Sequence, residues 1–413
     1  MEYNIRNMES IKAYKFRVYP DVKREAEINE RLLLSKDFYN LLLKNSIQSY
    51  KNGNKRISMA ILNRFAREIV AKDKKYLKLY SQTRCEIEYR ILKAYQNFFR
   101  RIKEKKGGKM QEVGFPRFKS KDRYKSITYP QYNGSFSIEK DRLRISRIGT
   151  MKIEMHRKID GEIKTLTIKK EAGKYYAIFT AIREIGPHRV PNTKPVGIDL
   201  GLNSFIAMSD GTKVQKPKFM NERKKMLARW QRIVARRHKG SRRREEAKMK
   251  LQKKWEHVTN LSNDYLHKLS AKLVNLGYTS FVVERLNIQN MVKNHRLAGA
   301  IMYTSWRKFI QMLSYKAESA GLEVIEVDAR NTSRICSNCG NIQEMPLSER
   351  MYSCNRCGLR IDRDINASIN ILNRATVGHT ESHARGDSVR PQGEAVAAEP
   401  RTYSASCRGS LGL

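Results

Sequence analysis

Acidic residues are scarce in this sequence of 413 residues. It contains 41 Asp and Glu against 83 Lys and Arg, which gives a formal net charge of +42 at pH 7. A folded chain this positive repels itself until a polyanion neutralises it, and nucleic-acid phosphates bind clustered Lys and Arg while releasing their own counterions. The charge balance therefore predicts a nucleic-acid partner, although a ribosomal-type protein would satisfy it equally well.

Long apolar runs are also missing. No stretch reaches the roughly 18 continuous apolar residues that cross a membrane, and residues 1–15 lack the apolar core of a signal peptide. We therefore expect no membrane association and a cytoplasmic location. The hydrophobic fraction of 40% is still sufficient for packed cores, and the length suits two or three domains.

Cysteines are too few for a disulfide scaffold, and four of the six form two C-x2-C pairs, each followed by a glycine. The pairs are Cys336 with Cys339 and Cys354 with Cys357. Four thiolates that can surround one ion predict a tetrahedral Zn²⁺ site, closed to substrate and so structural. The alternative, a pair of redox-active C-x2-C motifs, requires a βαβ context that this region does not have.

The first half of the chain predicts a β-rich domain with a helical insertion. Residues 11–19 alternate apolar and basic side chains, as in a half-buried strand. Residues 20–107 have helical periodicity, and residues 125–185 have the pattern of short strands and turns. We expect a β-barrel-like domain of residues 11–19 and 121–190, carrying a helical domain of residues 20–120.

The second half predicts a mixed α/β arrangement. A strand, a tight turn and a second strand begin at Val196, and two long basic helices follow in residues 217–277, broken near Gly240. A buried strand, a helix over residues 299–320 and a further strand lead to the cysteine pairs and a last helix. Residues 376–413 are small and polar, which predicts a disordered tail.

Three carboxylates stand in unusual places. Asp199 lies in an apolar strand and Glu284 ends another, where a charge is costly unless a partner stabilises it. Asp364 begins the last helix. Each has an ordinary explanation by itself: Asp199 as a turn former, Glu284 as a surface residue, and Asp364 as a helix N-cap.

Taken together, the order of the segments matches the RNase H-like fold, in which acids from two strands and a late helix converge. Three converging carboxylates repel one another unless divalent cations lie between them. Two Mg²⁺ ions about 4 Å apart would activate water and stabilise the leaving oxygen in phosphodiester cleavage, and oxygen ligands suit Mg²⁺.

Five motifs carry a family resemblance. VGIDLGLNSFIAMSDG, FVVERLNIQNM, NTSRICSNCG, YSCNRCG and DRDINASINI resemble, in this order, the RuvC-like nuclease domain of TnpB proteins, which are relatives of the type V CRISPR effectors. The resemblance covers residues 190–375. It implies that Asp199, Glu284 and Asp364 are the catalytic magnesium ligands, with Asp362 as the second candidate for the third acid. It also implies that the four cysteines form a zinc ribbon.

The resemblance implies a multidomain α/β architecture. A RuvC-like nuclease domain would comprise residues 191–330 and 360–375, with the zinc ribbon inserted at residues 331–359. The β-barrel-like domain would be the family's wedge domain, and the helical insertion its recognition domain. Such a protein binds a guide RNA as a monomer in a ribonucleoprotein. It recognises a short motif beside the target and cuts both strands of double-stranded DNA.

Other functions remain open at this point. A DNA-binding regulator without cleavage would not need the acids. A nuclease or transposase that works without RNA would share the acids but not the RNA. A structural RNA-binding protein would account for the charge and the zinc but not for acids in buried strands. The sequence also leaves open a miniature CRISPR effector, although the length favours a transposon protein.

Overall fold

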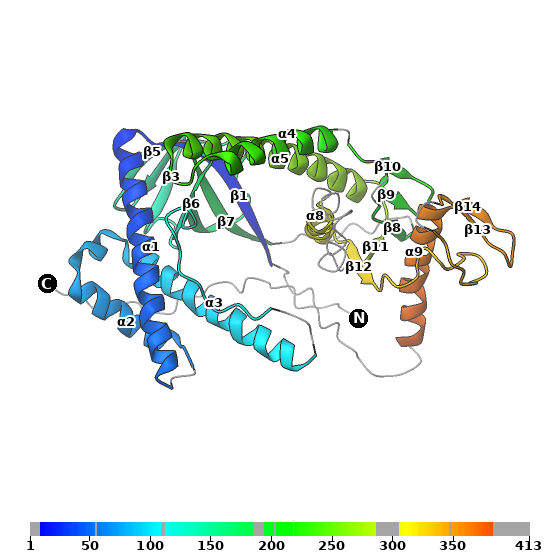
Figure 1. The fold of residues 1–413 in the computed structure, drawn as a ribbon, viewed down its shortest axis with the longest axis horizontal. Helices are drawn as coiled ribbons and strands as arrows, with labels where there is room; N and C mark the ends of the chain where they lie inside the picture. Colours follow the sequence, from blue (N-terminus) through cyan, green and yellow to red (C-terminus); the bar gives the residue numbers. More distant parts are fainter. Residues whose placement is uncertain are drawn as a thin grey trace. The chain divides into compact units, whose positions relative to one another are not determined.

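The computed structural model describes residues 9–53, 56–108, 112–184, 194–201, 204–217, 219–285, 305–346 and 349–382. The described residues form two compact units, one of residues 9–184 and one of residues 194–382, whose elements are labelled in Figure 1. In these ranges, no helix is both long and apolar enough to cross a membrane. The predicted disordered tail lies outside the described residues from 383 onward.

The first unit contains a seven-stranded antiparallel sheet with strand order β2-β6-β7-β1-β5-β4-β3. Its strands are β1 (Glu9–Tyr19), β2 (Ser126–Tyr129), β3 (Phe136–Glu139), β4 (Arg142–Ile145), β5 (Gly149–Glu154), β6 (Glu162–Glu171) and β7 (Lys174–Glu184). Tyr14, Phe16 and Val18 of β1 are buried while Lys15 is exposed, as the alternating sequence predicts.

Three α-helices and a 3-10 turn lie between β1 and β2. They are α1 (Val22–Lys51), α2 (Met59–Lys72), η1 (Lys74–Lys78) and α3 (Ser81–Lys106). Asp21 caps α1 by accepting the N–H of Arg24 at 2.7 Å. The last helix ends before Gly107, as predicted from the glycine pair.

The helices and the sheet of the first unit share one hydrophobic core. That core joins Phe38 and Leu42 of α1 and Ile91 of α3 to Phe179 of β7. On α3, the Thr83 hydroxyl donates to a main-chain carbonyl of β2 at 3.1 Å. An apolar sheet face must be covered, and these helices cover part of it. The division into wedge and recognition domains stays a prediction, and the core does not break at residue 120.

The second unit contains a five-stranded mixed sheet with strand order β10-β9-β8-β11-β12. Its strands are β8 (Val196–Asp199), β9 (Ser204–Met208), β10 (Lys213–Gln215), β11 (Ser280–Glu284) and β12 (Glu323–Val327). Strands β8, β11 and β12 are parallel to one another, and β9 is antiparallel to both of its neighbours, β8 and β10, so β10 runs in the same direction as β8. β8 and β11 are short apolar runs because helices cover both of their faces.

Side-chain alternation along β11 distinguishes the two faces of this sheet. Phe281 and Val283 pack with α5 (Arg242–Val274) and α8 (Trp306–Ser319). Val282 points to the other face, where it packs with Ile371 and Ala375 of α9 (Arg363–Ser382). Helices α5 and α8 therefore cover one face and α9 covers the other.

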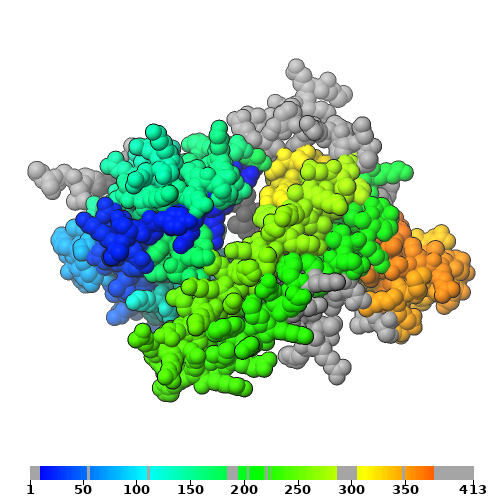
Figure 2. Space-filling view, turned by 90° about the horizontal axis from the view of Figure 1, so that it is seen from above, coloured from blue at the N-terminus to red at the C-terminus, as the bar shows by residue number. Residues whose placement is uncertain are grey.

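The long basic helices are α4 (Phe219–Arg236) and α5, which pack against each other. Gly240 between them has φ +89°, and Ser241 caps α5, so the predicted break is confirmed. Figure 2 shows both helices, in green, at the surface.

The cysteine-rich segment contains the hairpin β13 (Met351–Ser353) and β14 (Arg360–Asp362). It is part of the orange lobe in Figure 2. Helix α9 follows directly and continues to Ser382, so the predicted end of the ordered chain at residue 375 is too early. Once a helix is anchored by packing, each further residue adds a backbone hydrogen bond at little cost, and composition alone does not reveal this extension.

Candidate metal centres

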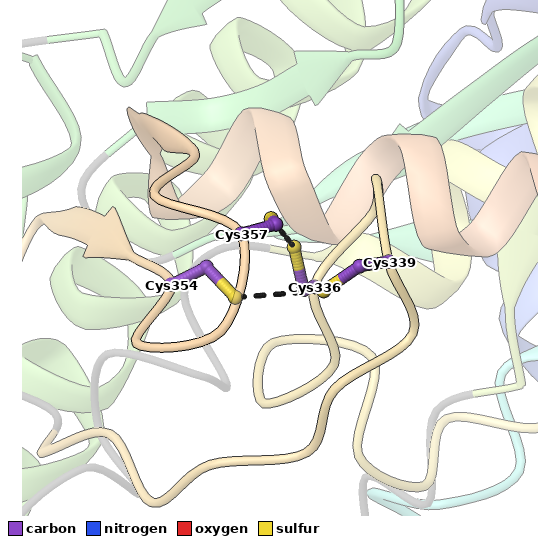
Figure 3. A group of neighbouring side chains, drawn as sticks. All are labelled: Cys336, Cys339, Cys354 and Cys357. Atoms are coloured by element: carbon purple, nitrogen blue, oxygen red, sulfur yellow. Dashed lines mark hydrogen bonds between the residues drawn. The ribbon is translucent and has the colours of Figure 1, made fainter.

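Four cysteine sulfurs converge beside the hairpin (Figure 3). Cys336 Sγ lies 3.6 Å from Cys357 Sγ, and Cys339 Sγ lies 3.6 Å from Cys354 Sγ. All four sulfurs lie within 4.8 Å of one another. Thiolates at about 2.3 Å from a tetrahedral zinc ion are about 3.8 Å apart. The predicted four-cysteine cluster is confirmed, and its geometry fits a structural zinc ion.

Each C-x2-C pair forms its own turn, and the two turns have the same backbone geometry. The N–H of Gly340 donates to the Cys336 carbonyl at 3.0 Å, and the N–H of Gly358 donates to the Cys354 carbonyl at 3.1 Å. The two glycines have φ +70° and +73°, a left-handed conformation that is strained for other residues. The glycines that follow each pair therefore close the turn beneath the sulfurs.

Hydrogen bonds lower the pKa of both cysteines of the second pair and so favour their thiolate forms. The pKa of Cys357 falls to about 6 because the backbone N–H of Leu359 and the side-chain amide of Asn338 both donate to its sulfur. Since the thiolate is the metal ligand, these donors favour the charge state that a cation requires.

Asp199 and Glu284 end two neighbouring parallel strands. Val283 pairs with Ile198, so the next residues along β11 and β8 are Glu284 and Asp199. Both lie two residues beyond a position that faces α9, since Val282 packs on that helix and Gly197 approaches Ser368. Period-two alternation therefore directs both carboxylates to the α9 face.

The first turn of α9 brings Asp364 to the same edge. Gly197 allows this because a Cβ built there would lie 2.0 Å from the Ser368 carbonyl oxygen. Burial raises the pKa of Asp199 well above its ordinary value, and the negative charges of Glu284 and Asp364 raise it further. The structure therefore places Glu284 and Asp364 close enough to Asp199 for their charges to act on it.

Burial also raises the pKa of Glu284, which is 8% exposed, while a hydrogen bond from the Thr332 hydroxyl opposes that rise. Asp199 and Asp364 are partly exposed, so an ion can reach them from solvent. Among the described residues, only the four cysteines have all their ligand atoms within 4.8 Å of one another. The oxygens of the three carboxylates are therefore more widely spaced than the four sulfurs.

Asp362 has a different role from Asp364. Its Oδ1 accepts the backbone N–H of Asp364 at 2.9 Å and of Ile365 at 3.3 Å, and its Oδ2 lies 2.5 Å from Lys213 Nζ. Burial alone would raise the pKa of Asp362, but Lys213 and these N–H groups lower it. Asp362 is therefore the residue that caps α9, and the interpretation of Asp364 as an N-cap is wrong.

Sequence reasoning missed several polar residues around the trio. Thr332 donates to Glu284, and Asn366, Asn370 and Arg374 of α9 donate to main-chain carbonyls in residues 328–335. The last three are spaced by four residues, which places them on one helix face. That spacing was the available signal, because an apolar helix face rarely carries buried amides without partners.

Two family models match the chain. The one described as "Probable transposase" matches residues 171–295, and "Cas12f1-like, TNB domain" matches residues 306–371. Together they extend from the end of β6 to the middle of α9, and so include the three carboxylates and the four cysteines.

Relatives match over nearly the whole length. A "Putative RNA-guided DNA endonuclease" of Streptomyces pristinaespiralis is 30% identical over 400 residues, which is 94% of each chain. The protein of Escherichia coli K12 named "Putative RNA-guided DNA endonuclease InsQ" is 27% identical over 88% of this chain and 92% of its own.

The fold resembles that of a Cas12f1 protein solved in complex with sgRNA and target DNA. The TM-score is 0.57 at 12% identity, covering 89% of this chain and 99% of that one. The match supports a multidomain mixed α/β fold. From its relatives and matching motifs, the chain belongs to the TnpB family of RNA-guided DNA endonucleases.

Proposed function

We propose that this protein is an RNA-guided endonuclease that cuts both strands of a DNA duplex by metal-dependent phosphodiester hydrolysis. The observation that carries the proposal is the meeting of Asp199, Glu284 and Asp364 at one edge of the mixed sheet. Family membership supports the same activity. The intact acids argue against a regulator that only binds DNA.

The carboxylates fit a pair of Mg²⁺ ions. Bound Mg²⁺ would supply an activated water and neutralise the leaving oxygen. Two ions about 4 Å apart are held by ligands spread over a wider span than one zinc ion needs, which agrees with the wider spacing of the three carboxylates. Burial and mutual repulsion raise the pKa of Asp199, and cations between the carboxylates would relieve that repulsion.

The mixed sheet supports assignment of residues 194–382 to an RNase H-like, RuvC-type domain. In that fold, one strand of a five-stranded sheet runs antiparallel to the other four, and acids end the central pair of parallel strands. The strand order β10-β9-β8-β11-β12 agrees with this arrangement. We assign the four-cysteine group to one structural Zn²⁺, because four thiolates leave no coordination position open for substrate.

The guide RNA and the basic protein surface would recognise different features of the target. Guide pairing supplies target specificity, and the protein holds backbones and a short flanking motif. Helix α5 offers an exposed basic surface for such contacts, made of Arg242, Arg243, Lys250, Lys253 and Lys254. We expect a monomer in a ribonucleoprotein, located in the cytoplasm of a prokaryotic cell, where guide RNA and target DNA are found.

The proposal is tested by sequencing RNA that co-purifies with the protein and then cutting DNA with a reprogrammed guide in Mg²⁺. Asp199→Ala should abolish cleavage and leave DNA binding nearly intact. The control Asp264→Ala, which removes an exposed carboxylate paired with Lys268 on α5, should cut normally. Cutting that survives RNase treatment would instead indicate an RNA-independent nuclease. Guided binding by the wild type without cutting would indicate a regulator.

A further inference from the structure

Two buried amides of α9 hold the main chain around the first cysteine pair. Asn366 is 0% exposed, and its Nδ2 donates to the Ile335 carbonyl at 2.7 Å. Its Oδ1 accepts the N–H of Ser337 at 2.9 Å. Cys336 lies between these two bound residues, so the amide fixes the backbone on both sides of a metal ligand.

Asn370, one turn further along α9, also binds main-chain carbonyls of this segment, nearer to Glu284. It is 6% exposed, and its Nδ2 donates to the carbonyls of Thr332 and Ile335 at 2.8 and 2.7 Å. One turn further, the Arg374 guanidinium donates to the carbonyls of Asp328 and Arg330. One face of α9 therefore binds residues 328–337, here called the connecting segment, which runs from β12 to the first cysteine pair.

Thr332 is the residue through which the connecting segment reaches Glu284. Its side chain is buried, and its hydroxyl donates to Glu284 Oε1. Asn370 holds the Thr332 carbonyl, which limits where that hydroxyl can point. Hydrogen bonds of this kind orient a metal ligand, and their loss commonly costs about 10–100-fold in metal affinity.

We propose that Thr332 is a positioning residue for Glu284, and that Asn366 and Asn370 couple it to the four-cysteine site. Metal binding at the cysteines fixes Cys336, and the amides transmit that order along the connecting segment to Thr332. The cysteine site thereby controls the affinity of the carboxylates for divalent cations, beyond stabilising its own hairpin. This inference rests on the proposed magnesium role of the carboxylates.

The first test measures Mn²⁺ binding by electron paramagnetic resonance on the full chain with its RNA. Thr332→Val, which keeps the shape and removes the hydroxyl, should weaken binding about tenfold. Thr332→Ser, which restores the hydroxyl, should bind within about twofold of wild type. Equal binding by all three proteins would overturn the proposal, and so would equal weakening by both variants, because packing would then explain the loss.

The second test measures the coupling. Cys357→Ser removes one of the four cysteine sulfurs, and it lies outside the connecting segment, so the segment itself is unchanged. As a single substitution it should weaken Mn²⁺ binding. Combined with Thr332→Val it should weaken binding little more than Thr332→Val alone, since both changes release the same hydrogen bond. Additive losses would overturn the coupling. If Thr332→Val does not fold, as judged by circular dichroism, Asn370→Leu replaces it in both tests with the same expected order.

Failure of this inference is distinguishable from failure of the proposed function. Asp199→Ala should abolish Mn²⁺ binding at the carboxylate site, leaving only the Mn²⁺ bound by RNA. If the wild type shows no Mn²⁺ site that depends on Asp199, the nuclease assignment fails. If that site exists and is insensitive to Thr332→Val, only the positioning role fails.

Discussion

Asp199 and Glu284 directly follow Ile198 and Val283, which lie opposite each other on two parallel strands, and both carboxylates face α9. The arrangement follows from alternation alone, because Gly197 and Val282 two residues earlier face the same helix. Burial disfavours the ionised form of Asp199, and the negative charges of Glu284 and Asp364 disfavour it further, so the pKa of Asp199 lies well above its ordinary value.

We therefore expect Asp199→Asn to stabilise the protein in magnesium-free buffer at pH 8 while abolishing cleavage. The wild-type carboxyl is protonated in both folded and unfolded states below the ordinary pKa of Asp. As the pH rises toward the raised folded pKa, only the unfolded state loses its proton readily, so wild-type stability falls. The melting temperatures of the two proteins should diverge as the pH rises and agree near pH 3.5.

The control for this experiment is Asp264→Asn, which changes an exposed carboxylate and should leave the melting temperature unchanged at both pH values. Identical melting of Asp199→Asn and wild type at pH 8 would show that neither burial nor neighbouring charge penalises the ionised Asp199 carboxylate in the metal-free protein.

Local patterns in the sequence predicted much of this fold. The alternation in β1, the glycines after each cysteine pair and the break at Gly240 are short-range signals, and the structure has the feature that each predicts. The cysteine cluster was equally readable, because C-x2-C spacing is itself a geometric constraint.

Contacts between distant segments were not readable. Asn366 and Asn370 looked like ordinary polar residues in a helix, because their partners at Ile335 and Ser337 lie about thirty positions away. The roles of Asp362 and Asp364 were ambiguous for a related reason. Both lie at the start of the helix, and the distant partners Lys213 and Asp199 help to distinguish them.

Gly197→Ala should separate α9 from the sheet. A Cβ at this position would lie 2.0 Å from the Ser368 carbonyl oxygen and 3.0 Å from Leu372 Cβ, and a backbone oxygen in a packed helix cannot move aside. We expect a loss of stability of about 1–3 kcal/mol, typical of overpacking, and strongly reduced cleavage. Gly114→Ala is the control because no atom lies within 4 Å of its added Cβ. Unchanged melting of Gly197→Ala would contradict this packing.

Glu88 is a destabilising buried acid in the first unit. It is 3% exposed, its Oε2 has no hydrogen-bond partner among the described residues, and burial raises its pKa to about 7. Its penalty is absent below the ordinary pKa of Glu and grows as the pH rises to about 7. Glu88→Gln should therefore stabilise the protein at pH 8 by about 1–3 kcal/mol, with no gain at pH 4.

Denaturant unfolding measures this difference. Glu86→Gln is the matched control on the same helix, since Glu86 is equally buried but lies 3.8 Å from Arg90 Nε, and it should not stabilise the protein. A stabilisation of Glu88→Gln that does not depend on pH would contradict the titration of this carboxyl.

Metal content distinguishes the cysteines inside and outside the cluster. Cys354→Ser removes one of four ligands, and we expect the bound zinc, measured by mass spectrometry of the purified protein, to fall from one ion per chain toward none. Cys85→Ser changes a cysteine on α3 that is not part of the cluster and should keep the full zinc content. Full zinc content in Cys354→Ser would contradict the four-thiolate site.

The third acid of the trio can be identified by comparing Asp362→Asn with Asp364→Asn. Asp362 is occupied in capping α9 and pairing with Lys213, whereas the charge of Asp364 acts on Asp199. Asp364→Asn should therefore abolish cleavage and leave the helix intact. Asp362→Asn keeps a capping oxygen but removes the charge at the start of α9 and the ion pair with Lys213, so it should cost about 0.3–1 kcal/mol of stability and retain measurable cleavage. If Asp362→Asn alone abolished cleavage in a folded protein, Asp362 would be the metal ligand and the position of α9 would have to shift when cations bind.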